Sequence, residues 1–169
     1  ARWPQSLYTA VNICLASRFP IVIYWGADYV VFYNDAYREI LANKHPWALG
    51  RGAREVWAEI WEIIGPMLDS GMATGQATWS DDLLLMLGRR GYAEECYFSF
   101  SFSPVQMEHG GIGGVFTAVT ETTQRVLSER RLHTLRDLAA HAGEAKSGEE
   151  ACRIAAESLA SNPADLPFA

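Results

Sequence analysis

The chain has 169 residues, of which 49% are apolar and 12% aromatic, and it carries a formal net charge of -6. This composition is enough for one well-packed domain with appendages, and it contains no apolar run near the length of about 18 residues that a membrane span requires. The negative charge argues against nucleic acid or an anionic membrane as the partner.

The first part of the chain is predicted to form a helix, a hairpin and a second helix. Apolar residues between Ser6 and Ala16 recur at the spacing of a short amphipathic helix, with Leu7, Val11, Cys14 and Leu15 on its apolar face. Two strand-like runs, Ile21 to Trp25 and Tyr29 to Tyr33, flank a short turn and indicate a β-hairpin. Asn34 then stands where it can cap a helix through Tyr37 to Ala42.

A helical segment and three strands are predicted next. One helical face carries Val56, Trp57, Ile60, Trp61 and Ile64, and residues 66–71 form a further turn or helix start. Strands are expected over residues 77–87, 96–105 and 112–119, with glycine-bearing connections between them. Strand pairs separated by a helical segment predict an α+β fold, with an antiparallel sheet and helices on one side.

The last strand passes directly into a long helix. Val115, Thr117 and Val119 alternate as in a strand that is covered on both faces, and a helical pattern begins beyond Thr120. The helix presents a wide apolar arc, and Glu121 lies four residues before Arg125, so an ion pair is expected in its first turn. Such an apolar arc requires another apolar surface to pack against.

Four segments together resemble a PAS domain: residues 31–37 (Val-Phe-Tyr-Asn-Asp-Ala-Tyr), residues 45–50 (His-Pro-Trp-Ala-Leu-Gly), the Ser103-Pro104 strand end and residues 119–123 (Val-Thr-Glu-Thr-Thr). The last is similar to the motif with which PAS domains pass into a signalling helix, with Glu121 in the acidic place and Thr123 in the threonine place. The resemblance implies a five-stranded antiparallel sheet with helices on one face over residues 18–120. It also implies an N-terminal cap helix in residues 1–17 and a coiled-coil-like signalling linker helix in residues 121–146.

The tail is predicted to begin another helix. Residues 147–150 (Ser-Gly-Glu-Glu) form a capping box, and Cys152, Ala155, Ala156 and Leu159 make an apolar stripe. Residues 147–169 resemble the truncated start of a GAF domain. The alternative is a C-terminal helix that folds back on the first domain.

Catalysis is not expected in this chain. The four histidines have no mutual spacing that suits a metal, and no nucleophile or dinucleotide-binding motif is present. The paired carboxylates at residues 81–82 and 94–95 are explained by solvation in loops or at strand edges.

Strict alternation over residues 97–103 places Phe98, Phe100 and Phe102 on one sheet face and serines on the other. By resemblance this face looks into the PAS cavity opposite the helical flank, so the candidate cavity lining is Trp57, Trp61, Phe98, Phe100, Phe102 and Val119. These side chains either hold a small apolar or aromatic ligand or simply fill the cavity. No flavin or haem is expected, because the motif of flavin-binding relatives and the histidine of haem-binding relatives are absent, and Val119 stands where a flavin-contacting glutamine would be.

The resemblance implies a sensory, signal-transmitting PAS module of a bacterial receptor, most similar to the front modules of multi-domain sensor histidine kinases that act in a phosphorelay. The alternatives are a ligand-free dimerisation module and, more distantly, a small-molecule-binding enzyme. A homodimer through the cap and linker helices is expected, followed in the same chain by GAF and kinase domains. The residues expected to transmit the signal are Glu121, Thr123, Arg125, Leu127, Arg131, Leu135 and Leu138. Three scattered cysteines indicate a reducing, cytoplasmic location.

Overall fold

The structure is a computed structural model that describes residues 3–142, 147–160, 162 and 165. The chain divides into two compact units, residues 1–123 and residues 124–169. No helix among the described residues is both long enough and apolar enough to cross a bilayer.

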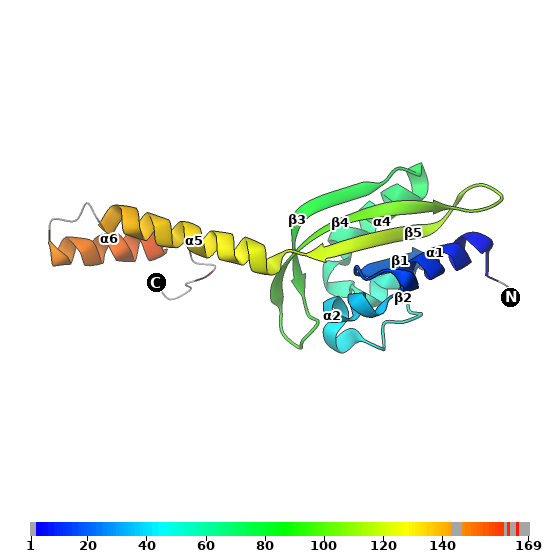
Figure 1. Ribbon diagram of the computed structural model, residues 1–169, viewed down its shortest axis with the longest axis horizontal. Helices are drawn as coiled ribbons and strands as arrows, with labels where there is room; N and C mark the ends of the chain where they lie inside the picture. The colour runs from blue at the N-terminus through cyan, green and yellow to red at the C-terminus, as the bar shows by residue number, and fades with distance from the viewer. Residues whose placement is uncertain (1–2, 143–146, 161, 163–164, 166–169) are drawn as a thin grey trace. The chain divides into compact units, whose positions relative to one another are not determined.

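The first unit is built on a five-stranded sheet, β1 (Ile21–Trp25), β2 (Val30–Tyr33), β3 (Thr78–Leu87), β4 (Glu94–Gln106) and β5 (Ile112–Glu121). The strand order is β2-β1-β5-β4-β3, and every neighbouring pair is antiparallel (Figure 1). The first strand therefore lies beside the last, and Ile21 pairs with Ala118. The predicted fold class and hairpin are confirmed.

Short helices cover one face of this sheet. They are α2 (Arg38–Leu41), α3 (Ala53–Val56) and α4 (Trp61–Thr74), joined in part by 3-10 turns. A large core cluster fills the space between these helices and the sheet. The prediction of one continuous helical face through Val56 and Ile64 was wrong, because the backbone leaves the helical conformation at Trp57, with φ of -117°, and a 3-10 turn intervenes.

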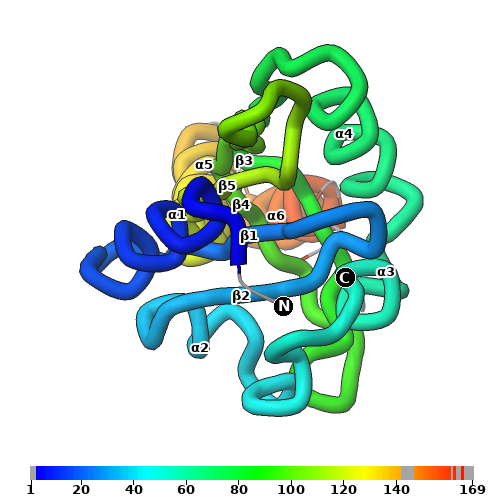
Figure 2. The backbone as a smooth tube through the Cα atoms, turned by 90° about the vertical axis from the view of Figure 1, so that its right-hand side faces the viewer, coloured from blue at the N-terminus to red at the C-terminus, as the bar shows by residue number. Residues whose placement is uncertain are grey.

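A single helix, α1 (Gln5–Ala16), packs on the opposite face of the sheet (Figure 2). Its Leu7 and Cys14 are buried against Ile21 and Ile23, as predicted, but Leu15 is 64% exposed. At about 100° per residue, Leu15 lies about 90° from the centre of the buried face, so it points away from the sheet.

Asn34 joins three segments of the first unit through its side chain. Its Oδ1 accepts hydrogen bonds from the backbone N–H of Tyr37 at 3.2 Å, the expected cap, and from that of Ile21 at 3.1 Å. Its Nδ2 donates to the carbonyls of Cys14, Ser17 and Phe19 at 3.0, 3.1 and 2.8 Å. The capped segment is a 3-10 turn, Asp35–Tyr37, that continues into the short helix α2, rather than one helix through Tyr37 to Ala42.

The second unit contains α5 (Thr123–Ala142) and α6 (Gly148–Ala160). The Oγ of Ser147 accepts from the backbone N–H of Glu150 at 3.2 Å, which confirms the predicted cap of α6. Cys152, predicted in the apolar stripe, is exposed, because the half-buried face of α6 is centred on Ile154 and Ala155 instead. After α6, Asp165 accepts two hydrogen bonds of 2.7 Å from Arg130 of α5.

Candidate functional site: an apolar cavity and the strand-to-helix junction

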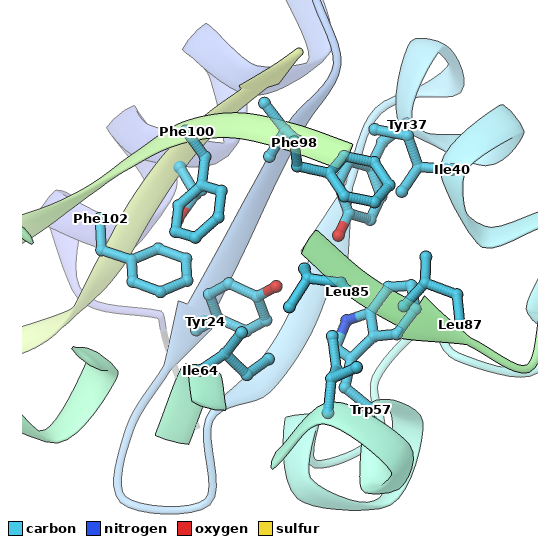
Figure 3. Close-up of a pocket in the computed structure, with 13 residues that line it drawn as sticks. Tyr24, Tyr37, Ile40, Trp57, Ile64, Leu85, Leu87, Phe98, Phe100 and Phe102 are labelled. Atoms are coloured by element: carbon cyan, nitrogen blue, oxygen red, sulfur yellow. The ribbon is translucent and has the colours of Figure 1, made fainter. Parts of the chain in front are cut away.

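An apolar cavity of about 40 Å³ lies in the first unit between the sheet and the helical flank (Figure 3). Sheet strands supply aromatic and aliphatic side chains to one wall, and the helical segments supply the other. The lining residues are Tyr24, Tyr37, Ile40, Trp57, Ile60, Ile64, Leu85, Leu87, Phe98, Phe100, Phe102, Thr117 and Val119.

The structure brings five of the six candidate lining residues together. Trp57, Phe98, Phe100, Phe102 and Val119 all line the cavity and are buried. The alternation along β4 explains this placement of the phenylalanines, because side chains two residues apart share one face of a strand. The rings of Phe100 and Phe102 lie 4.7 Å apart between centroids.

Trp61 does not line the cavity. It is half-buried and packs against Tyr29, with ring centroids 5.9 Å apart. The backbone break after Val56 separates Trp61 from Trp57, so the two indoles do not share one helical face.

Residues with a polar group also line this cavity, and sequence reasoning missed three of them, Tyr24, Tyr37 and Thr117. Tyr24, Tyr37, Trp57 and Thr117 line it, and the two hydroxyls and the indole nitrogen point toward one another in Figure 3, but almost all of the accessible cavity surface is apolar. The alternation of Val115, Thr117 and Val119 in the sequence places Thr117 on the same strand face as Val119. This alternation could have identified Thr117 as a lining residue.

The hydroxyls of the two tyrosines stay protonated. Burial raises the pKa of Tyr24 to about 12, even though hydrogen bonding to Tyr37 and Trp57 acts in the other direction. Burial, together with the neighbouring Tyr24, holds the pKa of Tyr37 well above its ordinary value. Both tyrosines beside the cavity are therefore neutral at physiological pH.

The cavity is small for a ligand site. Pockets for drug-sized ligands usually measure about 300–1,000 Å³, whereas a single water needs about 10–15 Å³ of such space. The volume of about 40 Å³ therefore has room for roughly three waters or one molecule of similar total size.

The second part of the site is the junction where β5 ends. Arg89, 3% exposed, donates from Nη2 and Nη1 to the two carboxylate oxygens of Glu121 at 2.7 and 2.9 Å. It also donates to Glu94 at 3.2 Å and to the carbonyl of Ile40 at 3.2 Å. Burial raises the pKa of Glu121, but the hydrogen bonds and charge of Arg89 outweigh that effect and hold the pKa below its ordinary value.

The predicted ion pair between Glu121 and Arg125 is wrong. β5 continues to Glu121, so this residue lies in a strand, and the i,i+4 geometry of a helix does not apply to it. Arg125 instead pairs with Glu129 at 3.1 Å on the surface of α5.

Thr123 joins the start of α5 to β4. Its Oγ1 accepts from the backbone N–H of Tyr97 at 2.9 Å and donates to Glu121 at 3.1 Å. The backbone N–H of Thr122 donates to the carbonyl of Tyr97 at 2.8 Å. These bonds place Glu121 and Thr123, both expected to transmit the signal, in one hydrogen-bonded cluster with Arg89.

The other residues expected to transmit the signal lie along α5. Leu127 and Leu138 are half-buried, whereas Leu135 is 60% exposed. Arg131 is exposed, and its Nε lies 3.8 Å from Asp165. Within the described part of the chain, no group of three histidine, cysteine or acidic side chains is placed to hold a metal ion.

A family model described as PAS fold matches residues 17–127. Since the match spans more than half of the sequence, the chain belongs to the PAS fold family. No curated protein matches the chain.

Several solved structures share the fold. The PAS domain of Bordetella pertussis BvgS is 19% identical with a TM-score of 0.58, over 78% of this chain and 97% of that one. A phage VqmA–DPO complex is 13% identical with a TM-score of 0.54, over 95% of this chain and 80% of that one. An RNA-binding Light-Oxygen-Voltage receptor is 21% identical with a TM-score of 0.54, over 85% of this chain and 40% of that one. These structures thus share the PAS fold with the chain.

Proposed function

We propose that this PAS domain senses a stimulus in its cavity and transmits it to α5 through the cluster of Arg89, Glu121 and Thr123. The observation that carries the proposal is that the cavity wall and the junction share residues. Phe98 lines the cavity and is also the register partner of Glu121 across β4 and β5.

Arg89 also connects the cavity to the junction at Glu121. Ile40 lines the cavity, and its carbonyl accepts a hydrogen bond from Arg89. The guanidinium carbon of Arg89 lies 6.0 Å from the ring centroid of Phe98. Because a close-packed core transmits displacement rather than absorbing it, movement of Phe98 or Ile40 changes the position of the guanidinium that holds Glu121.

Under this proposal, the PAS domain is part of a cytoplasmic bacterial sensor histidine kinase, in which a GAF domain and kinase domains follow it and produce the output. A homodimer through the cap and linker helices fits the exposure of Leu132 and Leu135, which are 51% and 60% exposed on α5. The same exposure supports the second candidate, a dimerisation module that binds no ligand. The small cavity supports the expectation that neither flavin nor haem is bound.

The full-length receptor tests the proposal through Glu121→Gln, which keeps the side-chain shape and removes the charge that Arg89 binds. We expect its basal output to change and its response to the stimulus to weaken. Glu129→Gln is the matched control, since Glu129 pairs only on the exposed surface of α5, where a pair contributes little.

Normal basal output and normal response in the Glu121→Gln receptor would refute this route of transmission. A receptor that dimerises normally, but whose output depends on neither the cavity nor the junction, would favour the dimerisation module.

A further inference from the structure

Lys44 and Glu59 form an ion pair on the helical side of the first unit. Nζ of Lys44 lies 2.6 Å from Oε1 of Glu59, and the two side chains are 16% and 29% exposed. Because both are shielded, salt screens their attraction less than it screens a fully exposed pair. The same Oε1 accepts a hydrogen bond from the backbone N–H of Gly88 at 3.1 Å. The pair therefore ties two 3-10 turns of the helical flank to the connection between β3 and β4.

Lys44 also contacts a residue of the cavity wall. Its Nζ lies 4.5 Å from the ring centroid of Trp57, within the range of about 6 Å over which a cation is attracted to an aromatic face. The same Nζ donates to the carbonyl of Val56, the last residue of α3. Trp57 is 3% exposed and lines the cavity. A displacement of this indole therefore changes the surroundings of the Lys44 ammonium group directly.

The helical flank holds the backbone on both sides of the Arg89 side chain. The N–H of the preceding residue, Gly88, donates to Glu59, and the carbonyl of Arg89 itself accepts from the N–H of Asn43 at 3.1 Å. Two-point bonding between a guanidinium and a carboxylate depends on the placement of both planar groups. The position of this backbone therefore decides how well Arg89 meets Glu121.

Glu59 is charged at neutral pH, so its attraction for Lys44 is present under physiological conditions. Burial raises its pKa, but the hydrogen bonds from Lys44 and Gly88 outweigh that effect and hold the pKa below its ordinary value. A charged acceptor makes a stronger hydrogen bond than a neutral one. Glu59 therefore holds the N–H of Gly88 more firmly than a neutral side chain would.

We propose that Lys44 and Glu59 are positioning residues for the ion pair of Arg89 and Glu121. They carry a displacement of Trp57 to the backbone at Gly88 and so to the guanidinium at the junction. This path differs from the contacts through Phe98 and Ile40, because it acts on the main chain that carries Arg89 rather than on its guanidinium. The inference rests on the proposed function, since it adds a second path between the same cavity and the same junction.

The intact chain tests the junction end of this path through Glu59→Ala, which removes the acceptor of both hydrogen bonds. Carbon-13 NMR of the Glu121 carboxyl group during a pH titration measures its pKa. We expect Glu59→Ala to raise that pKa toward its ordinary value, because a displaced guanidinium stabilises the carboxylate less. We also expect the Arg89 Nε–H to exchange with water about tenfold faster, the change that accompanies the loss of about one hydrogen bond. Glu62→Ala, on the exposed side of α4, is the matched control and should change neither quantity.

Two substitutions at Lys44 separate positioning from simple support of the fold. Lys44→Met keeps most of the apolar stem and removes the charge, so it should move the pKa of Glu121 in the same direction as Glu59→Ala. Lys44→Arg keeps a charge, hydrogen-bond donors and the contact with an aromatic face, so it should preserve the wild-type pKa of Glu121. Urea unfolding shows that each variant is folded under the conditions of the titration.

The cavity end of the path is tested by Trp57→Phe, which keeps an aromatic ring but reduces its size. We expect this change to shift the Arg89 Nε–H resonance in the otherwise wild-type chain. The shift should be smaller when Lys44→Met is also present, because the contact that carries the displacement is then missing. An equal shift in both backgrounds would overturn the path through Lys44.

An unchanged Glu121 pKa and unchanged exchange at Arg89 in folded Glu59→Ala and Lys44→Met proteins would also overturn the inference, as would equal changes in Glu62→Ala. If Glu59→Ala does not fold, Lys44→Met alone decides. Failure of the proposed function is a separate result, because it is read in the receptor. There, a normal response of Glu121→Gln refutes transmission through the junction, whereas an impaired response combined with no effect of Lys44→Met on the junction refutes only the positioning role.

Discussion

Arg89 and Glu121 form a two-point ion pair at the end of β5, with distances of 2.7 and 2.9 Å between the guanidinium nitrogens and the two carboxylate oxygens. The pair joins the connection between β3 and β4 to Glu121, the last residue of β5, which lies two positions before the start of α5. Because Arg89 is almost fully buried, it depends on this carboxylate and on Glu94 for compensation of its charge.

Replacement of Glu121 with Gln should lower the free energy of unfolding by about 2 kcal/mol, because a hydrogen bond to a charged group is lost while the guanidinium stays buried. Urea unfolding followed by circular dichroism measures the change. Glu129→Gln, which alters an exposed pair, should stay within about 0.5 kcal/mol of wild type. Equal stability of the two variants would contradict a structural role for the Arg89 pair.

Acid should destabilise the wild type more steeply than the Glu121→Gln variant. The pKa of Glu121 in the folded state lies below the ordinary value of 4.5. Its ionised form therefore stabilises the fold above that ordinary value, and the contribution is lost as the pH falls through the lowered folded-state pKa. Urea unfolding at a series of pH values from neutral to strongly acidic measures the two slopes, and parallel curves would refute the assignment.

The cavity wall should be sensitive to truncation. Phe98 is 2% exposed, and Phe98→Ala should cost about 3–5 kcal/mol, because apolar burial is lost and a void remains. Trp79→Ala removes a larger ring from the neighbouring strand β3, but that ring is 68% exposed, so the cost should be about 0.5 kcal/mol. Thermal unfolding compares them, and a larger effect at Trp79 would be inconsistent with the observed sheet faces.

Asn34→Asp should destabilise the first unit by more than about 3 kcal/mol, although the side chains are nearly identical in shape. The amide Nδ2 donates to three backbone carbonyls, and a carboxylate oxygen in its place would be a buried charge facing three acceptors. Asn12→Asp on the exposed side of α1 is the control and should be nearly neutral. Chemical denaturation decides between them, and an unchanged midpoint for Asn34→Asp would exclude the hydrogen-bond network described.

Arg131→Leu should tighten a homodimer formed through α5. Arg131 is exposed and lies on the same side of the helix as the exposed Leu132 and Leu135, so the substitution extends one apolar strip. His133→Leu adds the same side chain on the opposite side of α5 and should not have this effect. Light scattering over a range of concentrations measures the association, and a monomer at every concentration for wild type and Arg131→Leu would remove the dimer proposal.

Much of the sheet could be predicted from local pattern alone. The alternation that put Phe98, Phe100 and Phe102 on one face is a property of the extended backbone, and it holds whatever that face contacts. The hairpin of β1 and β2 follows for the same reason. Likewise, Asn34 as a cap depends on the N–H of a residue only three positions away.

Other features depended on segments that are distant in sequence. Trp61 does not line the cavity as expected, because the backbone leaves the helical conformation after Val56. Leu15 points away from the sheet, because the sheet covers only the centre of the apolar face of α1. Local periodicity describes which residues share a side, but it does not say how wide a side the neighbouring element covers.

The sequence by itself determined the strands, the helix boundaries near Asn34 and Ser147, and the aromatic face of β4, since each follows from backbone geometry over a few residues. Only the tertiary structure decided that Glu121 pairs with Arg89, 32 positions away, and that Trp57 and Thr117 line one cavity. Such contacts between distant residues depend on strand register and on how a helix packs over a sheet. Both are determined by the packing of the whole core rather than by any one segment.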